Sequence, residues 1–164
     1  MVAIAAADQL SKVWAVNALS DGRIRQVLGT FFQLKLVYNQ GGVMGSDLGS
    51  GAFYMISSLF VLIFVFYFIY FSKHNRLIAY PMAVVAGGAI GNIIDRLRLG
   101  QVVDFLDLDF FDISLGSYHL ERWWTFNIAD AAITVGVIFV VIALFLTRKS
   151  ARTADQSPTS NSPA

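Results

Sequence analysis

Three aspartates interrupt apolar stretches of this chain. Asp95 lies near the end of the run GGAIGNIIDR, Asp104 follows in VVDF, and Asp130 lies near the start of the next apolar run, in FNIADAAI. Placing a carboxylate within a membrane span costs free energy, so each of these aspartates is a candidate for a functional site. Two aspartates held close together do not both ionise readily and tend to share one proton. One can then act as a general base on water while the other, as a general acid, polarises a carbonyl group. The residues alone leave open which two of the three form such a pair.

Further polar residues share helix faces with these aspartates. Asn92, Asp95 and Arg96 are spaced i, i+3 and i+4, and Asn127 precedes Asp130 by three residues. We expect Asp95 and Arg96 to form an ion pair at a helix end, although Arg96 is equally able to reach an anionic or carbonyl group of a substrate. Asn127 suits helix capping, whereas Asp130 is predicted to lie about five residues inside its helix, about 7 Å below the start, too deep for a cap.

Composition excludes several classes of protein. The chain has 164 residues, of which 56% are hydrophobic and 14% charged, and its mean hydropathy of +0.61 exceeds that of an ordinary soluble domain. A net charge of +1 gives no basic face for nucleic acid. The absence of cysteine excludes disulfides and thiolate metal sites. We predict neither a metal nor a cofactor. Asp107, Asp109 and Asp112 lack the glycine and glutamate of an EF-hand loop and are predicted to lie on a solvated outer surface.

Apolar segments long enough to span a bilayer position these residues. Residues 51–71, about 77–98 and about 125–147 each provide roughly the 20 apolar residues that a spanning helix needs. The basic sequences SKHNR and RKSAR follow the first and third of these segments, and positive residues mark the cytoplasmic side. Residues 20–50 and 99–124 are therefore expected to face outward. All three aspartates then lie on the outer side of the membrane.

The N-terminal segment is too short for a complete span. Only seven residues precede Asp8, about 10 Å of helix, so we interpret it as a truncated first helix. Asp8 and Lys12 are spaced to pair on one face. In FFQLKLVYN, apolar and polar residues alternate with one exception, Val37, which predicts a strand. The segment from 150 to 164 is rich in Ser, Thr, Pro and Ala and is predicted to be a disordered cytoplasmic tail, leaving 1–149 as a single membrane domain.

Five motifs, in order, resemble those of the bacterial lipoprotein signal peptidase family, also called signal peptidase II. They are DQLSK (8–12), NQG (39–41), GGAIGNIIDR (87–96), VVDF (102–105) and FNIAD (126–130). The resemblance covers about residues 5 to 147. It implies a mainly α, polytopic membrane protein: a four-transmembrane-helix bundle, with its first helix truncated here, a small outward-facing β platform and an outer amphipathic segment. It places the protein in the bacterial cytoplasmic (inner) membrane, with the active site near the outer face and the C-terminus cytoplasmic.

The resemblance also assigns roles to residues of this chain. It implies an aspartyl dyad of Asp104 and Asp130, and leaves Asp95 a structural role. Residues expected to bind substrate or support the site are Asn39, Gly41, Asn92, Arg96, Asn127, Asp8 and Lys12. The implied substrate is a prolipoprotein carrying diacylglycerol on its cysteine, which the enzyme cleaves N-terminal to that cysteine. Membrane lipids and globomycin-type inhibitors are the other implied partners.

This chain departs from the family pattern in two further places. NQG continues as Gly42-Val43-Met44 in place of the usual small residues and phenylalanine, and the stretch between the two dyad aspartates looks extended. Two non-enzymatic alternatives stay open from the residues themselves. One is a small membrane carrier with proton-binding aspartates, and the other is an assembly subunit whose glycine ridge binds partner helices.

Overall fold

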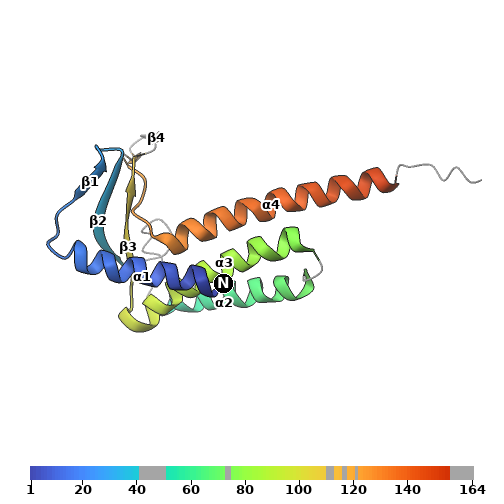
Figure 1. Ribbon diagram of the computed structural model, residues 1–164, viewed down its shortest axis with the longest axis horizontal. Helices are drawn as coiled ribbons and strands as arrows, with labels where there is room; N and C mark the ends of the chain where they lie inside the picture. The colour runs from blue at the N-terminus through green and yellow to red at the C-terminus, as the bar shows by residue number, and fades with distance from the viewer. Residues whose placement is uncertain (41–50, 73–74, 110–112, 116–117, 121, 156–164) are drawn as a thin grey trace, which may run out of the picture.

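A sheet lies across one end of a bundle of helices in this computed structural model (Figure 1). The structure describes residues 1–164 except 41–50, 73–74, 110–112, 116–117, 121 and 156–164. The elements in chain order are α1 (Val2–Ala18), β1 (Arg25–Leu28), β2 (Phe32–Asn39), α2 (Gly51–Phe71), α3 (Arg76–Leu99), β3 (Val102–Leu108), β4 (Ile113–Leu115), β5 (Tyr118–Leu120) and α4 (Ile128–Asp155).

Among the described residues, three helices are long and apolar enough to cross a membrane. They comprise Phe53–Phe71, Arg76–Leu99 and Ile128–Thr147, with mean hydropathies of 2.2, 1.8 and 2.6. More than half of the α3 segment is buried inside the protein, a far larger share than in α2 or α4, because α3 packs against α1, α2 and α4. The predicted spans are therefore confirmed, and α3 is the central helix.

Small residues let the neighbouring helices approach α3 closely. A Cβ atom on Gly91 would lie 2.5 Å from Asp8 Oδ2 of α1, and one on Gly88 would lie 2.5 Å from the backbone oxygen of Ala129 in α4. Both separations are far below van der Waals contact, so a side chain at either position would push a neighbouring helix away. The glycines of α3 therefore bring α1 and α4 onto neighbouring faces of the same helical segment, where these two helices also contact each other.

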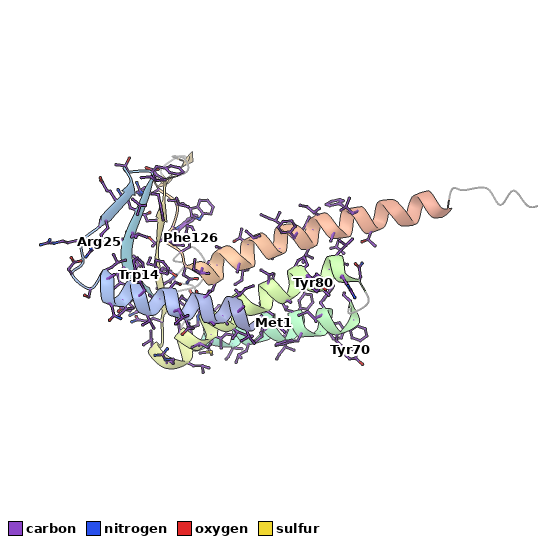
Figure 2. The ribbon with its side chains drawn as sticks, viewed as in Figure 1. Met1, Trp14, Arg25, Tyr70, Tyr80 and Phe126 are labelled. Carbon is purple, nitrogen blue, oxygen red and sulfur yellow. The ribbon has the colours of Figure 1, made fainter. Side chains whose placement is uncertain are left out.

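Helix α1 runs beside the half of the bundle that adjoins the sheet, and Met1 lies about midway along the bundle (Figure 2). The far end of α1 packs on β3: Ala15 and Leu19, both fully buried, form a core cluster with Phe105. Apolar burial of this kind contributes roughly 25 cal/mol per Å². The cluster therefore fixes the position of β3 relative to the helices.

The sheet has the strand order β1-β2-β3, with both pairs antiparallel. The strand predicted from FFQLKLVYN is confirmed as β2. Its pairing with β3 shifts register between Leu34 and Val37, so the exception in the alternating pattern coincides with a bulge. Beyond the bulge, Val37 pairs with Asp104 and Asn39 with Val102. Asp104 therefore lies on an extended segment, opposite β2.

Helix α4 begins and ends later than its hydropathy predicted. Phe126 forms an isolated bridge with Leu106 of β3, so the helix starts at Ile128 instead of near residue 125. The helix continues to Asp155, which corrects the prediction of disorder from residue 150 for the segment 150–155. Neither Gly nor Pro occurs in residues 150–155, and the next proline along the chain is Pro158. Residues 156–164 lie outside the described part of the chain.

Candidate active site

Asp104 and Asp130 meet at the junction of the sheet and the bundle, where Asn127 bonds to both. The Asn127 side-chain amide donates to Asp104 Oδ1 at 2.7 Å, and its backbone N–H donates to Asp130 Oδ2 at 3.2 Å. Asp104 lies on β3 and is 2% exposed, whereas Asp130 lies in the first turn of α4. Two aspartates 26 positions apart in the sequence are thus held by one residue, through its side chain and its backbone N–H.

Two more asparagines complete the hydrogen bonding of these carboxylates. Asn39, at the end of β2, donates to Asp104 Oδ2 at 3.0 Å, and Asn92 of α3 donates to Asp130 Oδ1 at 2.8 Å. The Asn92 carbonyl oxygen accepts in turn from the Asn127 amide at 3.1 Å. Every oxygen of both carboxylates therefore accepts a hydrogen bond from a neutral N–H group. Such donors orient the carboxylates without neutralising them.

Burial has a marked effect on the acidity of Asp104. Removal from solvent, first, and the negative charge of nearby Asp130, second, raise the pKa of its carboxyl to about 7. The hydrogen bonds from Asn39 and Asn127 and the positive charge of Lys12 act in the opposite direction, lowering the pKa. Near neutral pH the Asp104 carboxyl therefore exchanges readily between its protonated and ionised forms, as general acid–base chemistry requires.

The start of α4 corrects the expectation that Asp130 is too deep to take part in capping. Because the helix begins at Ile128, Asn127 directly precedes it, and the Asp130 backbone N–H donates to Asn127 Oδ1 at 2.9 Å. Together with the reciprocal bond from the Asn127 N–H to Asp130, this is a capping-box arrangement. The cap thus fixes the Asp130 side chain and leaves its second oxygen to Asn92.

A buried ion cluster lies beside the aspartates. Lys12 Nζ is 2.8 Å from Asp8 Oδ2 and 2.9 Å from Asp95 Oδ2, and it donates to Asn92 Oδ1 at 2.9 Å. The predicted Asp8–Lys12 pair is confirmed. The predicted pair of Asp95 with Arg96 is wrong within the described residues, because Asp95 faces α1 and pairs with Lys12.

The two remaining contacts of Asp95 support a structural role. Its Oδ2 accepts from the backbone N–H of Val103 at 3.0 Å, so it holds the start of β3. Its Oδ1 accepts from the Gln9 amide at 2.8 Å. The adjacent Arg96 is half-buried and lies close enough to Asp104 and Asp130 to interact with them electrostatically.

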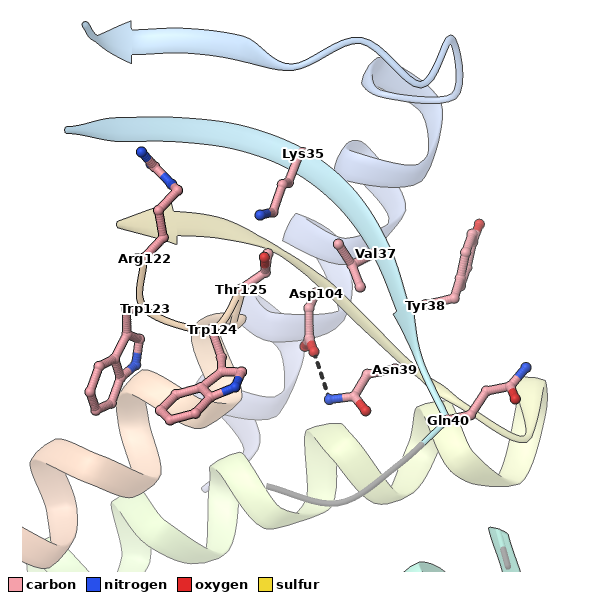
Figure 3. A pocket seen from close by; sticks show the side chains of 10 residues that line it. All are labelled: Lys35, Val37, Tyr38, Asn39, Gln40, Asp104, Arg122, Trp123, Trp124 and Thr125. Atoms are coloured by element: carbon pink, nitrogen blue, oxygen red, sulfur yellow. Dashed lines mark hydrogen bonds between the residues drawn. The ribbon is translucent and has the colours of Figure 1, made fainter. Parts of the chain in front are cut away.

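A cleft of about 600 Å³ opens beside Asp104 (Figure 3). The indole rings of Trp123 and Trp124 lie on one side of it and Asn39 on the other, with the Asp104 carboxylate between them. The remaining lining residues are Lys35, Val37, Tyr38, Gln40, Arg122 and Thr125. The cleft therefore leads from the outside to one of the two carboxylates.

Sequence reasoning missed several residues near this cleft. Asp107 was expected on a solvated surface, but it is 1% exposed and lies 3.2 Å from Lys35 and 3.3 Å from Arg122. The pairing of β3 with β2 buries it, and no local pattern in the sequence reveals that pairing. Gln9, in contrast, lies inside the DQLSK motif, which could have marked it. Gly41 and the departure at 42–44 fall outside the described residues.

Comparisons with known proteins agree with the motifs. The family described as "Signal peptidase (SPase) II" matches residues 1–146. A lipoprotein signal peptidase of Cupriavidus taiwanensis is 37% identical over 139 residues, covering 82% of this chain and 74% of the relative. One of Desulforapulum autotrophicum is 37% identical over 149 residues, covering 87% of each.

Solved structures show the same fold. A bacterial membrane enzyme determined by the in meso method at 2.3 Å has a TM-score of 0.77 and 29% identity, covering 98% of this chain and 91% of its own. A second, determined at 1.9 Å, has a TM-score of 0.71 and 31% identity over 87% of this chain and 88% of its own. The chain belongs to the signal peptidase II family of membrane peptidases, which process lipoprotein precursors.

Proposed function

We propose that this protein is an aspartic endopeptidase that removes the signal peptide from diacylglyceryl-modified prolipoproteins, cleaving N-terminal to the lipidated cysteine. Asp104 and Asp130 are its catalytic residues. The observation that carries this proposal is the joint hydrogen bonding of both carboxylates by Asn127, with Asp104 open to the cleft. Family membership favours this function over the carrier and the assembly subunit.

The dyad works with one shared proton. The ionised carboxylate takes a proton from water, whose oxygen attacks the carbonyl carbon before the cysteine, while the protonated carboxyl hydrogen-bonds to the carbonyl oxygen. The tetrahedral intermediate collapses as the C–N bond breaks, and the departing nitrogen receives a proton from the dyad. The products are the signal peptide carboxylate and a free amine on the lipidated cysteine. The two groups titrate as a pair.

The neighbouring residues support this chemistry by position. Asn92 and Asn127 hold the carboxylates in fixed orientations, and Asn39 does so from the sheet. Arg96 is proposed to bind the substrate backbone near the scissile bond, and Gly41 to allow its close approach. Lys12, which pairs with Asp8, supports the site by donating a hydrogen bond to Asn92. Preorganisation of this kind lowers the entropic cost of reaching the transition state.

The distribution of charge supports an orientation for the chain. The C-terminal end of α2, the start of α3 and the C-terminal end of α4 lie at the end of the bundle away from the sheet (Figure 1). In the sequence, SKHNR lies between α2 and α3, with Arg76 as the first residue of α3, and RKSAR lies in the last turns of α4, which favours a cytoplasmic location for this end of the bundle. The sheet and the dyad are then near the outer face of the inner membrane. A diacylated substrate approaches laterally from the lipid.

A gel-shift assay on purified protein in detergent with diacylglyceryl-prolipoprotein tests the proposal. We expect cleavage by the wild type and by the control Asp21→Asn, which changes an exposed residue of the outer region. We expect no cleavage by Asp104→Asn or Asp130→Asn. Retained activity in either dyad variant would refute the assignment. EDTA should leave cleavage unchanged, since two carboxylates suffice, and globomycin should inhibit it. Inhibition by EDTA would instead indicate a metal-dependent mechanism.

A further inference from the structure

The segment that connects β5 with α4 forms a wall of the cleft. Its backbone lies along the free edge of β3: the Trp123 N–H donates to Leu108 O at 3.2 Å, and the Phe126 N–H donates to Leu106 O at 2.9 Å. Between these two points the chain presents Trp123 and Trp124, whose rings are 5.1 Å apart and edge-to-face. The wall is therefore aromatic and held at both ends.

Arg122, immediately before the two tryptophans, ties this wall to three other segments. Its Nη2 donates to Thr30 O between β1 and β2 at 2.8 Å, and its Nη1 lies 2.9 Å from Asp109 Oδ2. Its Nε lies 3.3 Å from the buried Asp107, which Lys35 also contacts at 3.2 Å. One guanidinium thus links the β1–β2 turn, β3 and the residue after β3.

This arrangement requires arginine. A guanidinium has five donors in a rigid plane, whereas a lysine ammonium is a point charge on a flexible stem. Lysine at position 122 cannot reach Thr30, Asp107 and Asp109 together with the same geometry. Arg122 makes no contact with Asp104 or Asp130 among the hydrogen bonds and ion pairs of the described residues, so its effect on the reaction must pass through the wall.

The position of the wall indicates which part of a substrate it meets. The helices that contain the apolar spans extend away from the sheet (Figure 1), and Asp104 lies on β3 of that sheet, so a signal peptide and acyl chains belong with the helices. A polypeptide leaving the dyad outward passes between Trp123–Trp124 and the end of β2 (Figure 3). Aromatic surfaces with a few polar groups, here Lys35 and Thr125, suit an extended peptide.

We propose that Arg122 is a positioning residue that holds Trp123 and Trp124 as the binding wall for the polypeptide on the mature side of the scissile bond, following the lipidated cysteine. The inference rests on the proposed function and assigns the cleft beside Asp104 to a substrate segment. The wall improves binding of that segment and leaves the chemistry of the dyad unchanged.

Two substrates that share the signal peptide and the diacylglyceryl cysteine test this inference. One continues for about ten residues after the cysteine, and the other ends at the cysteine amide. The steady-state kcat and KM of each are measured with the wild type, Arg122→Gln, Arg122→Lys, Trp124→Ala and the control Arg25→Gln, an exposed arginine of the same sheet. Thermal unfolding of each variant in detergent is recorded in parallel.

We expect the wild type and Arg25→Gln to favour the long substrate through a lower KM. In Arg122→Gln and Trp124→Ala the preference for the long substrate should fall by about tenfold or more, because small misplacements of positioning groups slow a reaction by up to about 100-fold. The activity of these variants on the short substrate and their pH profile should stay as in the wild type. The preference of Arg122→Lys for the long substrate should lie between those of the wild type and Arg122→Gln. Trp124→Ala keeps the test independent of any folding defect in the Arg122 variants.

Other outcomes overturn the inference. A wild type that cleaves both substrates equally well would show that the cleft does not bind the mature side. Equal losses on both substrates in Arg122→Gln and Trp124→Ala would show a merely structural role for the wall. A wild type that cleaves neither substrate would refute the proposed function itself, which is a distinguishable result.

Discussion

Replacing Lys12 by methionine should strongly destabilise the protein. Lys12 is 3% exposed, and its ammonium group lies within 3 Å of carboxylates of Asp8 and Asp95 that are 0% and 3% exposed. Methionine has a similar length but no charge, so the variant leaves two buried carboxylates without a cation. Breaking a buried pair by removing one partner costs about 3–5 kcal/mol. Because one cation serves both acids, we expect a single loss of this size and not two.

The remaining neighbours of these carboxylates are neutral donors and do not offset the loss. Asp8 Oδ1 accepts from the Ala129 N–H at 2.9 Å, and Asp95 accepts from Gln9 and from the Val103 N–H. A loss of about 4 kcal/mol corresponds to a roughly thousandfold fall in the ratio of folded to unfolded protein. Reversible unfolding in mixed micelles, followed by tryptophan fluorescence, measures this quantity.

Two further variants control the experiment. Arg25→Met breaks an exposed pair with Asp21 at 3.2 Å and should cost less than about 1 kcal/mol. Adding Asp8→Asn and Asp95→Asn to Lys12→Met removes the buried charges and should recover about half of the lost stability. A Lys12→Met variant as stable as Arg25→Met would refute the reasoning, as would a triple variant less stable than Lys12→Met alone.

Three other perturbations have defined outcomes. Asn39→Ala removes a hydrogen bond that lowers the pKa of Asp104, so the pKa of this carboxyl should rise. The fall in kcat/KM as pH rises through about 7, where the carboxyl loses its proton, should therefore move to higher pH. A pH profile of kcat/KM that is unshifted or moves to lower pH would contradict this. Gly91→Ala places a Cβ 2.5 Å from Asp8 and should lower the free energy of unfolding by about 1–3 kcal/mol, as read from the micelle titration. Asp95→Asn should lower the yield of folded protein while each folded molecule keeps its activity; a well-folded but inactive variant would show that Asp95 acts in catalysis.

Local patterns predicted most of the elements because they depend on short-range physics. The three apolar segments are long enough to span a bilayer whatever their partners. The alternation in FFQLKLVYN predicted β2, and the spacing of Asp8 and Lys12 predicted their pair. The start of α4 was predicted less well, since hydropathy cannot detect that Phe126 pairs with Leu106.

Contacts between distant segments were beyond such patterns. Asp95 pairs with Lys12, 83 residues away in the numbering, and not with its neighbour Arg96. Asp107 is buried by strand pairing and by Arg122, although its acidic surroundings predicted exposure. In both cases the competing partner comes from another element, and sequence proximity is a poor guide to it.

The sequence by itself determined that this is a membrane protein with carboxylates at costly positions, because hydropathy and charge are properties of the residues. Its motifs also indicated the family and which two aspartates to examine. Only the tertiary structure decided how those aspartates are held: β3 pairs with β2 and follows α3, so Asp104 reaches the first turn of α4, where Asn127 bonds to both carboxylates. That arrangement depends on the packing of α1, α3 and α4 through small residues, which no single segment specifies.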